Sequence, residues 1–305
     1  MLQIIDKRKY AYIVSAVLVA ISIALIFSIG LKPGIDFKGG TLMEVQFSEG
    51  DGEEKAVIPT NEGVRAGLAE LNLSDLIIQS SENNSFILRY IESDEKTNEG
   101  VVEKLKELNQ NMTQKRVDFI GSSISGQIKK NAIIAVIVAV IGVALYIAWA
   151  FRKVSYPVPS SEYGMGAIVA LAHDLILTLG IFVLLGKFLG VEVGIPFIAA
   201  LLTILGYSVN DTIVVYDRIR ENLMRSGNKV DFEKIVNKSL NETLARSINT
   251  SLTVVAVLLA IVFFGGESIK YFSVALLAGV IFGTYSSVFV ASALLVSSYN
   301  YKKNN

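Results

Sequence analysis

The sequence places two carboxylates inside long apolar segments. Asp211 lies in the stretch Gly206–Asn222, GYSVNDTIVVYDRIREN, which continues an apolar run from Ile195 to Leu205. Asp174 lies near the middle of another apolar segment, beside the single histidine, His173. A carboxylate in a membrane segment costs several kcal/mol unless it is paired, hydrated or protonated. Each is therefore a candidate functional residue.

A polar stripe begins where the fifth apolar segment begins. Arg246 is followed at i+3, i+4 and i+7 by Asn249, Thr250 and Thr253, which lie on one helical face. Such a stripe is expected to face the helix bundle or a wet cavity, where a long arginine could reach Asp211. The chemistry that suits this pair is reversible protonation: ionised Asp211 would pair with Arg246, and protonated Asp211 would release it. The alternative role for Arg246 is an anchor that snorkels to the cytoplasmic surface.

Asn210 and Asp174 complete the group of proton-coupling candidates formed with Asp211 and Arg246. Two roles stay open for Asp174: a second proton-handling site together with His173, or a structural hydrogen-bond acceptor. The charges from Asp217 to Glu221 are interpreted as a solvated helix end.

The composition is typical of an integral membrane protein. Of 305 residues 52% are hydrophobic and 18% charged, and the mean hydropathy is +0.50. Lys+Arg and Asp+Glu both number 28, so net charge gives no indication of a nucleic-acid partner. The absence of cysteine excludes disulfides and thiolate metal sites, and one histidine excludes a His-rich metal centre. We expect no metal, no cofactor beyond protons as coupling ion, and no enzyme activity. An intramembrane aspartyl protease is disfavoured because Gly-x-Gly-Asp is missing.

Six segments are long and apolar enough to span a bilayer, which predicts an α-helical polytopic protein. They are Tyr10–Ile29, Ala132–Phe151, Gly164–Leu185, Gly194–Tyr216, Ile248–Phe264 and Tyr271–Tyr299. The first is longer than a signal-peptide core and is interpreted as a retained helix. Basic residues gather near Lys7, near Arg152, between Arg218 and Arg246, and near Lys302, whereas the two short loops on the other side hold only Lys187 and Lys270. This bias predicts both termini in the cytoplasm.

These spans divide the chain into residues 1–31, an external domain at 32–130, and residues 131–305 with an amphipathic segment at 217–247. In that segment Phe232, Ile235, Val236, Leu240 and Leu244 fall on one helical face, which predicts a helix at the cytoplasmic interface. The sixth span has small residues every four positions, which suit either packing inside the bundle or contact with a second subunit: Ala275, Gly279, Gly283 and Ser287.

The external domain is predicted to be a small α+β fold. Its pattern indicates strand Thr41–Phe47, helix Glu62–Leu71, strand Leu76–Ser80, strand Phe86–Ile91, helix Glu95–Leu108 and strand Arg116–Ile120, with a turn at Asn83-Asn84. The order βαββαβ is the ferredoxin-like arrangement. GIDFKGG precedes it, and its Gly39-Gly40 suits a tight turn into the first strand.

Four motifs resemble the SecF family, the smaller subunit of the SecDF protein-export complex in the resistance–nodulation–division superfamily. They are GIDFKGG with Gly34, Asp36, Phe37, Gly39 and Gly40, ALAHD in the third span, GYSVNDTIVVYDRIREN in the fourth, and NETLARSINTS before the fifth. The resemblance extends along the whole chain, and its fourth-span motif is highly specific.

The resemblance implies a multi-pass protein of the cytoplasmic membrane with a SecD-type subunit and a SecYEG-type channel as partners. It also implies proton-driven assistance to unfolded exported polypeptides, with the family's proton-linked aspartate on Asp211 and its essential arginine on Arg246. The alternative is a half-transporter that exports small molecules by proton antiport. The small external domain counts against it, and identifying the proteins that co-purify with the chain would separate the two.

Overall fold

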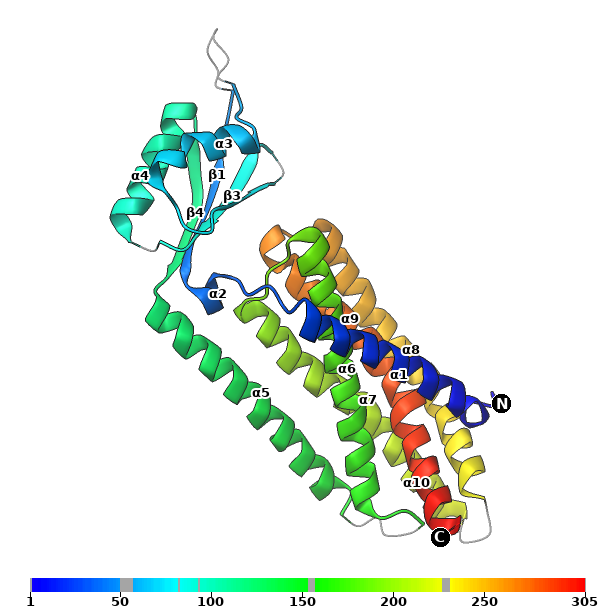
Figure 1. The fold of residues 1–305 in the computed structure, drawn as a ribbon. Coiled ribbons are helices and arrows are strands. Elements are labelled where there is room, and N and C mark those ends of the chain that lie inside the picture. Colours follow the sequence, from blue (N-terminus) through cyan, green and yellow to red (C-terminus); the bar gives the residue numbers. More distant parts are fainter. Residues whose placement is uncertain are drawn as a thin grey trace. The chain divides into compact units, whose positions relative to one another are not determined.

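The computed structural model describes residues 2–49, 57–81, 83–92, 94–152, 157–226 and 231–304 (Figure 1). The chain divides into two compact units, one formed by Met1–Lys32 with Ile134–Asn305 and the other by Pro33–Ile133. These limits lie close to the predicted boundaries at residues 32 and 130. The first unit holds the apolar helices, and the second holds the sheet.

The unit Pro33–Ile133 has the predicted βαββαβ order. Strands β1 (Gly40–Gln46), β2 (Ile77–Ser80), β3 (Ser85–Tyr90) and β4 (Thr113–Ile120) form an antiparallel sheet in the order β2-β3-β1-β4. Helix α3 (Asn61–Gly67) with the 3-10 turn η2 (Ala69–Leu71) follows β1, and helix α4 (Glu95–Leu108) follows β3. The predicted α+β fold is confirmed.

The core of this unit follows from strand alternation. On β1, Met43 and Val45 are buried while their neighbours are only partly covered. Val101 and Leu105 of α4 face the same side, so one face of the sheet and one face of α4 share a core. Asp94 caps α4 by accepting a hydrogen bond from the backbone N–H of Thr97 at 2.9 Å, and this bond lowers the pKa of its carboxyl.

Glycine is required where the chain enters the sheet. The short helix α2 (Ile35–Lys38) begins after Gly34 and is followed by Gly39 at φ 81° and Gly40 at φ 115°. A β-carbon on Gly40 would also overlap the carbonyl oxygen of Tyr90. At the predicted turn, Asn83 and Asn84 both have φ 56°, in the left-handed region that Asn tolerates better than most residues.

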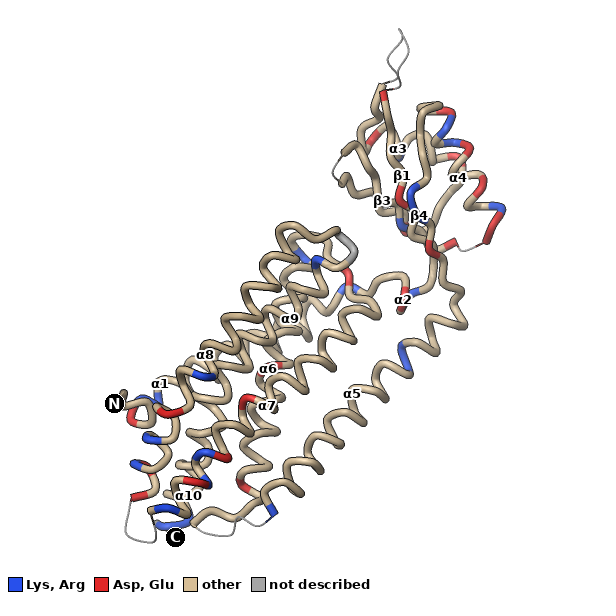
Figure 2. The backbone as a smooth tube through the Cα atoms, turned by 180° about the vertical axis from the view of Figure 1, so that it is seen from behind, with Lys and Arg blue, Asp and Glu red and all other residues tan. Residues whose placement is uncertain are grey.

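Six helical segments of the structure are long and apolar enough to cross a membrane, as predicted. They comprise α1 (Arg8–Ser28), preceded by the turn η1 (Ile5–Lys7), α5 (Ser122–Ala150), α6 (Ser160–Leu189), α7 (Ile195–Ser226), α8 (Phe232–Phe264) and a composite last helix. That last helix consists of α9 (Glu267–Ser286), a π-helical turn η4 (Ser287–Ala291) and α10 (Ser292–Asn304). Figure 2 shows charged residues of this bundle gathered towards the end that carries both termini.

The small-residue ridge of the last span packs inside the bundle. Ala275 is fully buried, and a β-carbon on Gly279 would overlap Ile204 of α7. At Gly283 an added β-carbon would lie 3.1 Å from the Cβ of Ser208, also on α7. Of the two alternatives left open by the sequence, the structure therefore supports close packing of α9 on α7.

The apolar stripe of the segment 217–247 is also covered by protein. Phe232, Val236 and Leu240 belong to the hydrophobic core of the bundle. They lie on α8, which runs uninterrupted from Phe232 to Phe264. The predicted helix is present and its apolar stripe packs against other helices of the bundle, whereas its position at the cytoplasmic interface stays a prediction. Residues 227–230 of the segment lie outside the described residues.

Candidate functional site

Asp174 is a fully buried carboxylate with three hydrogen-bond partners, two of which are serine donors. Its Oδ2 accepts from the Ser208 hydroxyl of α7 at 2.6 Å and from the Ser286 hydroxyl of α9 at 2.7 Å. Its Oδ1 lies 2.9 Å from Nδ1 of His173. The other ring nitrogen of His173 is buried without a partner among the described residues. Asp174 thus ties α6 to α7 and α9 inside the bundle.

Asp211 is half-buried and has two hydroxyl donors. Its Oδ1 accepts from Ser247 of α8 at 2.6 Å, and its Oδ2 accepts from Ser287 of the π-helical turn at 2.6 Å. Hydrogen bonds to a charged group contribute about 1.5–3 kcal/mol each. Asp211 therefore joins α7 to α8 and to the last span.

The donors of the two carboxylates are consecutive residues. Ser286 donates to Asp174, and Ser287 donates to Asp211. Ser287 also begins the π-helical turn, and its carbonyl oxygen accepts a hydrogen bond from the Ser292 hydroxyl at 2.9 Å. Single π-helical turns inside α-helices occur frequently at functional sites. The donors to the two carboxylates are thus joined by a single peptide unit. A rearrangement at one carboxylate would therefore act on a residue bonded directly to the donor of the other.

Arg246 does not take the position expected from the sequence. It is exposed, and no ion pair between Arg246 and Asp211 exists in the part of the chain that the structure describes. The hydroxyls of Ser247 and Ser287 donate hydrogen bonds to the Asp211 carboxylate instead. The anticipated ion pair is therefore corrected to a hydroxyl-bound carboxylate in this structure. Sequence spacing gave the right helix for Arg246 but not its orientation.

Helix α8 has three different faces around Asp211. Ser247 and Ser251 point into the bundle and are buried. Ile248 and Leu252 are apolar and exposed, with exposed fractions of 48% and 62%. The third face carries the polar stripe of the sequence, and all four of its residues are exposed: Arg246, Asn249, Thr250 and Thr253.

Helix α7 continues that polar surface. Its exposed positions between Thr203 and Asn210 are small or polar, namely Thr203, Gly206 and Asn210. Since α7 and α8 pack against each other, we call the combined set the α7–α8 polar face: Thr203, Gly206, Asn210, Arg246, Asn249, Thr250 and Thr253. Polar residues within membrane helices are expected to be covered by protein or water. The sequence predicted the polar stripe of α8, but in the structure the described residues leave this face exposed.

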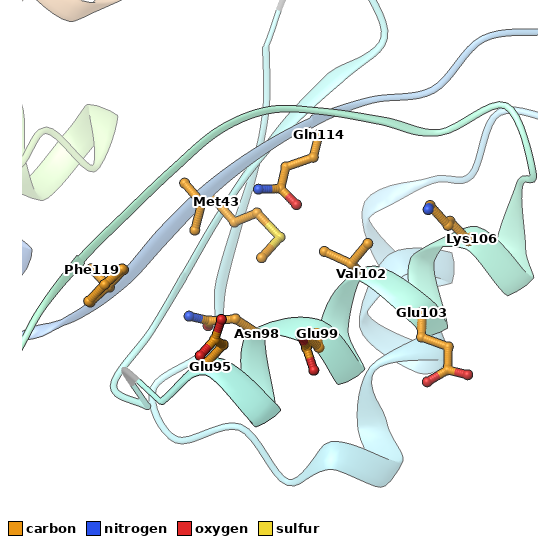
Figure 3. Close-up of a pocket in the computed structure, with 10 residues that line it drawn as sticks. Met43, Glu95, Asn98, Glu99, Val102, Glu103, Lys106, Gln114 and Phe119 are labelled. Atoms are coloured by element: carbon orange, nitrogen blue, oxygen red, sulfur yellow. The ribbon is translucent and has the colours of Figure 1, made fainter.

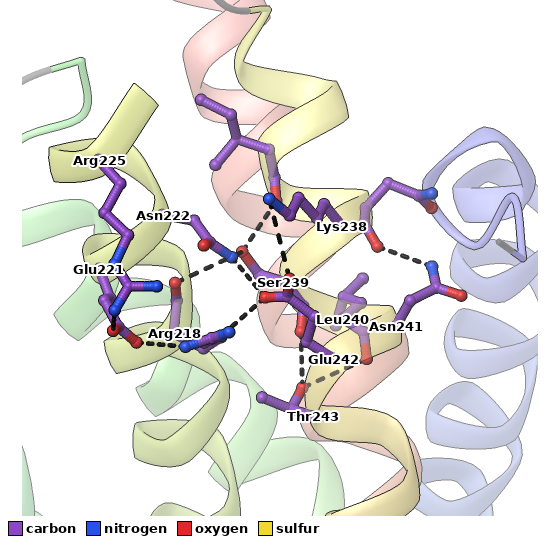
Figure 4. A network of polar contacts seen from close by, with 12 residues as sticks. Arg218, Glu221, Asn222, Arg225, Lys238, Ser239, Leu240, Asn241, Glu242 and Thr243 are labelled. Carbon is purple, nitrogen blue, oxygen red and sulfur yellow. Dashed lines mark hydrogen bonds and ion pairs between the residues drawn. The ribbon is translucent and has the colours of Figure 1, made fainter. Parts of the chain in front are cut away.

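A polar network that the sequence did not predict links α7 and α8 beyond the site (Figure 4). Arg218 donates to Glu242 at 2.7 Å and to Glu221, and Asn222 donates to the same Glu242 oxygen at 2.7 Å and to Ser239 at 2.9 Å. Arg218 and Asn222 are one helical turn apart, so their spacing placed them on one face. Their partner lies in another motif, and only the fold brings the two together.

Comparison with known proteins assigns the chain to a family. The model of the protein export membrane protein SecD/SecF C-terminal family matches residues 101–301, and the SecD/SecF GG motif matches residues 24–51. The first match contains both intramembrane carboxylates, Asp174 and Asp211, and the second contains Gly39 and Gly40.

Two curated relatives are similar along nearly their whole length. The protein translocase subunit SecF of Thermobaculum terrenum is 40% identical, covering 98% of this chain and 95% of the relative. That of Anaerolinea thermophila is 37% identical, covering 97% and 94%. The crystal structure of SecDF, a translocon-associated membrane protein from Thermus thermophilus, matches 97% of this chain with a TM-score of 0.81 and 32% identity. This chain spans 38% of that longer chain.

Proposed function

Because this chain belongs to the SecD/SecF family of protein export membrane proteins, we propose that it is a SecF-type accessory subunit of the Sec translocase, driven by the proton-motive force. It would act in the cytoplasmic membrane with a SecD-type subunit and a SecYEG-type channel, and assist unfolded polypeptides during export. The observation that carries the proposal is the half-buried carboxylate of Asp211, which hydroxyls from two other helices hold.

The proton step follows from the chemistry of this carboxylate. Ionised Asp211 only accepts hydrogen bonds, so Ser247 and Ser287 both donate to it. Protonation turns one carboxylate oxygen into a donor and removes the negative charge, so the serine bond to that oxygen weakens, breaks or reverses. The anchor that Asp211 provides for α8 and α9–η4 is weaker in that state. Each proton that crosses about 200 mV supplies roughly 4–5 kcal/mol, which is comparable to two such bonds.

Arg246 would act at a different step of the proton cycle from the one in which the serine bonds to Asp211 change. In the absence of an ion pair, the guanidinium lies on the α7–α8 polar face one residue from Ser247. Proton-dependent movement of α8 would bring it towards the carboxylate or away from it. The proposal therefore keeps Asp211, Arg246 and Asn210 as proton-coupling residues, and of the two roles left open for Asp174 it favours the structural acceptor.

The α7–α8 polar face supports a partner inside the membrane. Arg246 begins the fifth apolar span, and a charged residue inside a bilayer is unfavourable unless it is paired, hydrated or covered by protein, so exposure of Arg246 to lipid chains is disfavoured. We propose that a SecD-type subunit covers this face and that lipid covers the apolar face with Leu252.

A cysteine at Thr250 should therefore crosslink to the SecD-type subunit in native membranes. The matched control is a cysteine at Leu252, which is exposed on the opposite side of the same helix turn. Crosslinked products are separated by mass and identified by peptide sequencing. Equal crosslinking of the two positions to the partner, or capture by Leu252→Cys alone, would contradict the proposed interface.

The proposed orientation puts both termini in the cytoplasm and residues 32–130 outside. A cysteine at Lys96, on the exposed surface of α4, should react with an impermeant maleimide added to intact cells of a host without an outer-membrane barrier. A cysteine at Arg225, whose side chain is 67% exposed at the end of α7, should react only after permeabilisation. The reverse pattern would invert the topology. The chain has no native cysteine, so each label reports one position.

Small-molecule export by a half-transporter of the same superfamily remains the second candidate, because proton coupling at Asp211 would serve both. It predicts proton-dependent efflux without any effect on protein export. The curated relatives are named as translocase subunits, and this favours polypeptides.

A further inference from the structure

The sheet-containing unit has a groove between α4 and β4 (Figure 3). Its volume is about 750 Å³. Its apolar lining combines β1, α4 and β4 through Met43, Val102, Val117 and Phe119. Val117 and Phe119 have exposed fractions of 36% and 64%, although they lie opposite Met43 and Thr41, both buried on the helix-covered face. Helix α4 therefore leaves the part of this face formed by β4 uncovered.

The strand beside the groove is an edge strand. Within the described residues β4 pairs with β1 alone, so its other side has no neighbouring strand. Most of its side chains are exposed. An edge with free backbone N–H and C=O groups can accept another extended chain. The groove and the free edge run along the same strand.

The opposite wall of the groove is acidic. Glu95, Glu99 and Glu103 line it at i, i+4 and i+8 of α4, while Lys106 is the one basic residue in the described lining. The three glutamates make no ion pair with any described residue. Their charge favours a cationic ligand.

The spacing of the glutamates matches that of an extended chain. Four residues of helix advance about 6 Å, and two residues of strand advance about 6.6–6.8 Å. Alternate side chains of an added strand, which point to the same face, would thus meet successive glutamates. The pairing of β4 with β1 has an irregularity at Lys115, since Glu44 pairs with Arg116 and Val45 with Gln114, so a β-strand ligand with basic residues at every second position fits this wall along Arg116–Ile120.

We propose that this groove binds an extended polypeptide segment, added as a strand to β4, with Lys or Arg at alternate positions. The aliphatic stems of these residues would lie over Val117 and Phe119, and their charged ends would reach the glutamates of α4. An arginine would in addition stack on the exposed ring of Phe119. The inference rests on the proposed function, because it names the kind of segment that the exported polypeptide would present.

The test uses the purified full-length chain in lipid nanodiscs and a fluorescently labelled peptide of eight residues, the length of β4. The peptide has Lys at alternate positions and Thr between them, and its binding is followed by fluorescence anisotropy. The triple variant Glu95→Gln, Glu99→Gln, Glu103→Gln should bind about tenfold more weakly, since three exposed ion pairs are lost. Binding by the unsubstituted chain should also weaken as salt is raised.

Controls separate the groove from general charge and from the proposed export role. The triple variant Glu62→Gln, Glu70→Gln, Asp75→Asn removes the same charge outside the groove lining and should bind as the unsubstituted chain does. A peptide with Pro in place of a central Thr should bind poorly, because Pro cannot donate to β4. Equal binding by both triple variants, or full binding of the Pro peptide, would overturn the proposal. The assay needs neither partner nor proton gradient, so failure of the export role would not be mistaken for failure of the groove.

Discussion

Replacing Asp211 by asparagine should remove the entire proton-gradient-dependent component of protein export while the protein still folds and binds its partner. The amide has nearly the size of the carboxylate, and its oxygen can still accept from Ser247 or Ser287. It cannot take up a proton in this pH range, so the bond reversal that a gradient would drive is lost. Export into membrane vesicles, measured with and without the gradient at matched expression, is the readout.

Asp217 offers a matched control for this experiment. It is a carboxylate on the same helix, exposed and ion-paired with Arg220 at 3.4 Å. Asp217→Asn should therefore keep the full stimulation by the gradient. Normal stimulation in the Asp211→Asn variant would show that Asp211 does not carry the proton. Loss in both variants would point to an effect of charge on α7 and not to Asp211 in particular.

The sequence was sufficient for the architecture because local patterns determine it. Long apolar runs marked the six membrane helices, and strand alternation with turn residues such as Asn83-Asn84 marked the sheet. The strand bounds shifted by a few residues, most at β4, which begins at Thr113 and not at Arg116. Element ends depend on pairing with β1, which no local pattern contains.

The sequence identified the carboxylates of the candidate site but not the residues that donate hydrogen bonds to them. Its carboxylates stand out because they are rare in apolar segments, whereas their donors are serines that look like ordinary membrane-helix residues. Ser286 lies 112 residues from Asp174, and Ser287 lies 76 residues from Asp211, so only the fold identifies them. The π-helical turn has no sequence signature that would have placed it. The direction of Arg246 depended on which face of α8 packs inward.

Asp174 differs from Asp211 in access to protons. Asp174 has no exposed surface and three hydrogen-bond partners, whereas Asp211 is half-buried and has two. A proton carrier must exchange with water, and Asp211 meets that condition better. We therefore infer that Asp174 is chiefly a structural acceptor that fixes α6, α7 and α9 around the carrier.

This role predicts that substitutions of Asp174 act on stability first. Asp174→Leu should destabilise the bundle strongly, because the hydroxyls of Ser208 and Ser286 lose their acceptor, at about 1–3 kcal/mol for each buried group left unsatisfied. Asp174→Asn keeps an acceptor oxygen, and should retain most of the thermal stability and part of the gradient-dependent export. Melting in detergent, followed by the loss of monodisperse protein on size-exclusion chromatography, measures the first effect, and vesicle export measures the second.

The comparison with Asp211 distinguishes an anchor from a carrier. If Asp174 is an anchor, export by Asp174→Asn should fall only as far as the amount of folded protein falls, and the remaining molecules should respond to the gradient. If it carries protons, Asp174→Asn should be fully stable yet unresponsive, as expected for Asp211→Asn. Because Ser286 and Ser287 are adjacent, Ser286→Ala tests the same assignment without altering a carboxylate. It removes one donor to Asp174, and an anchor role predicts a lower melting temperature with the response to the gradient retained.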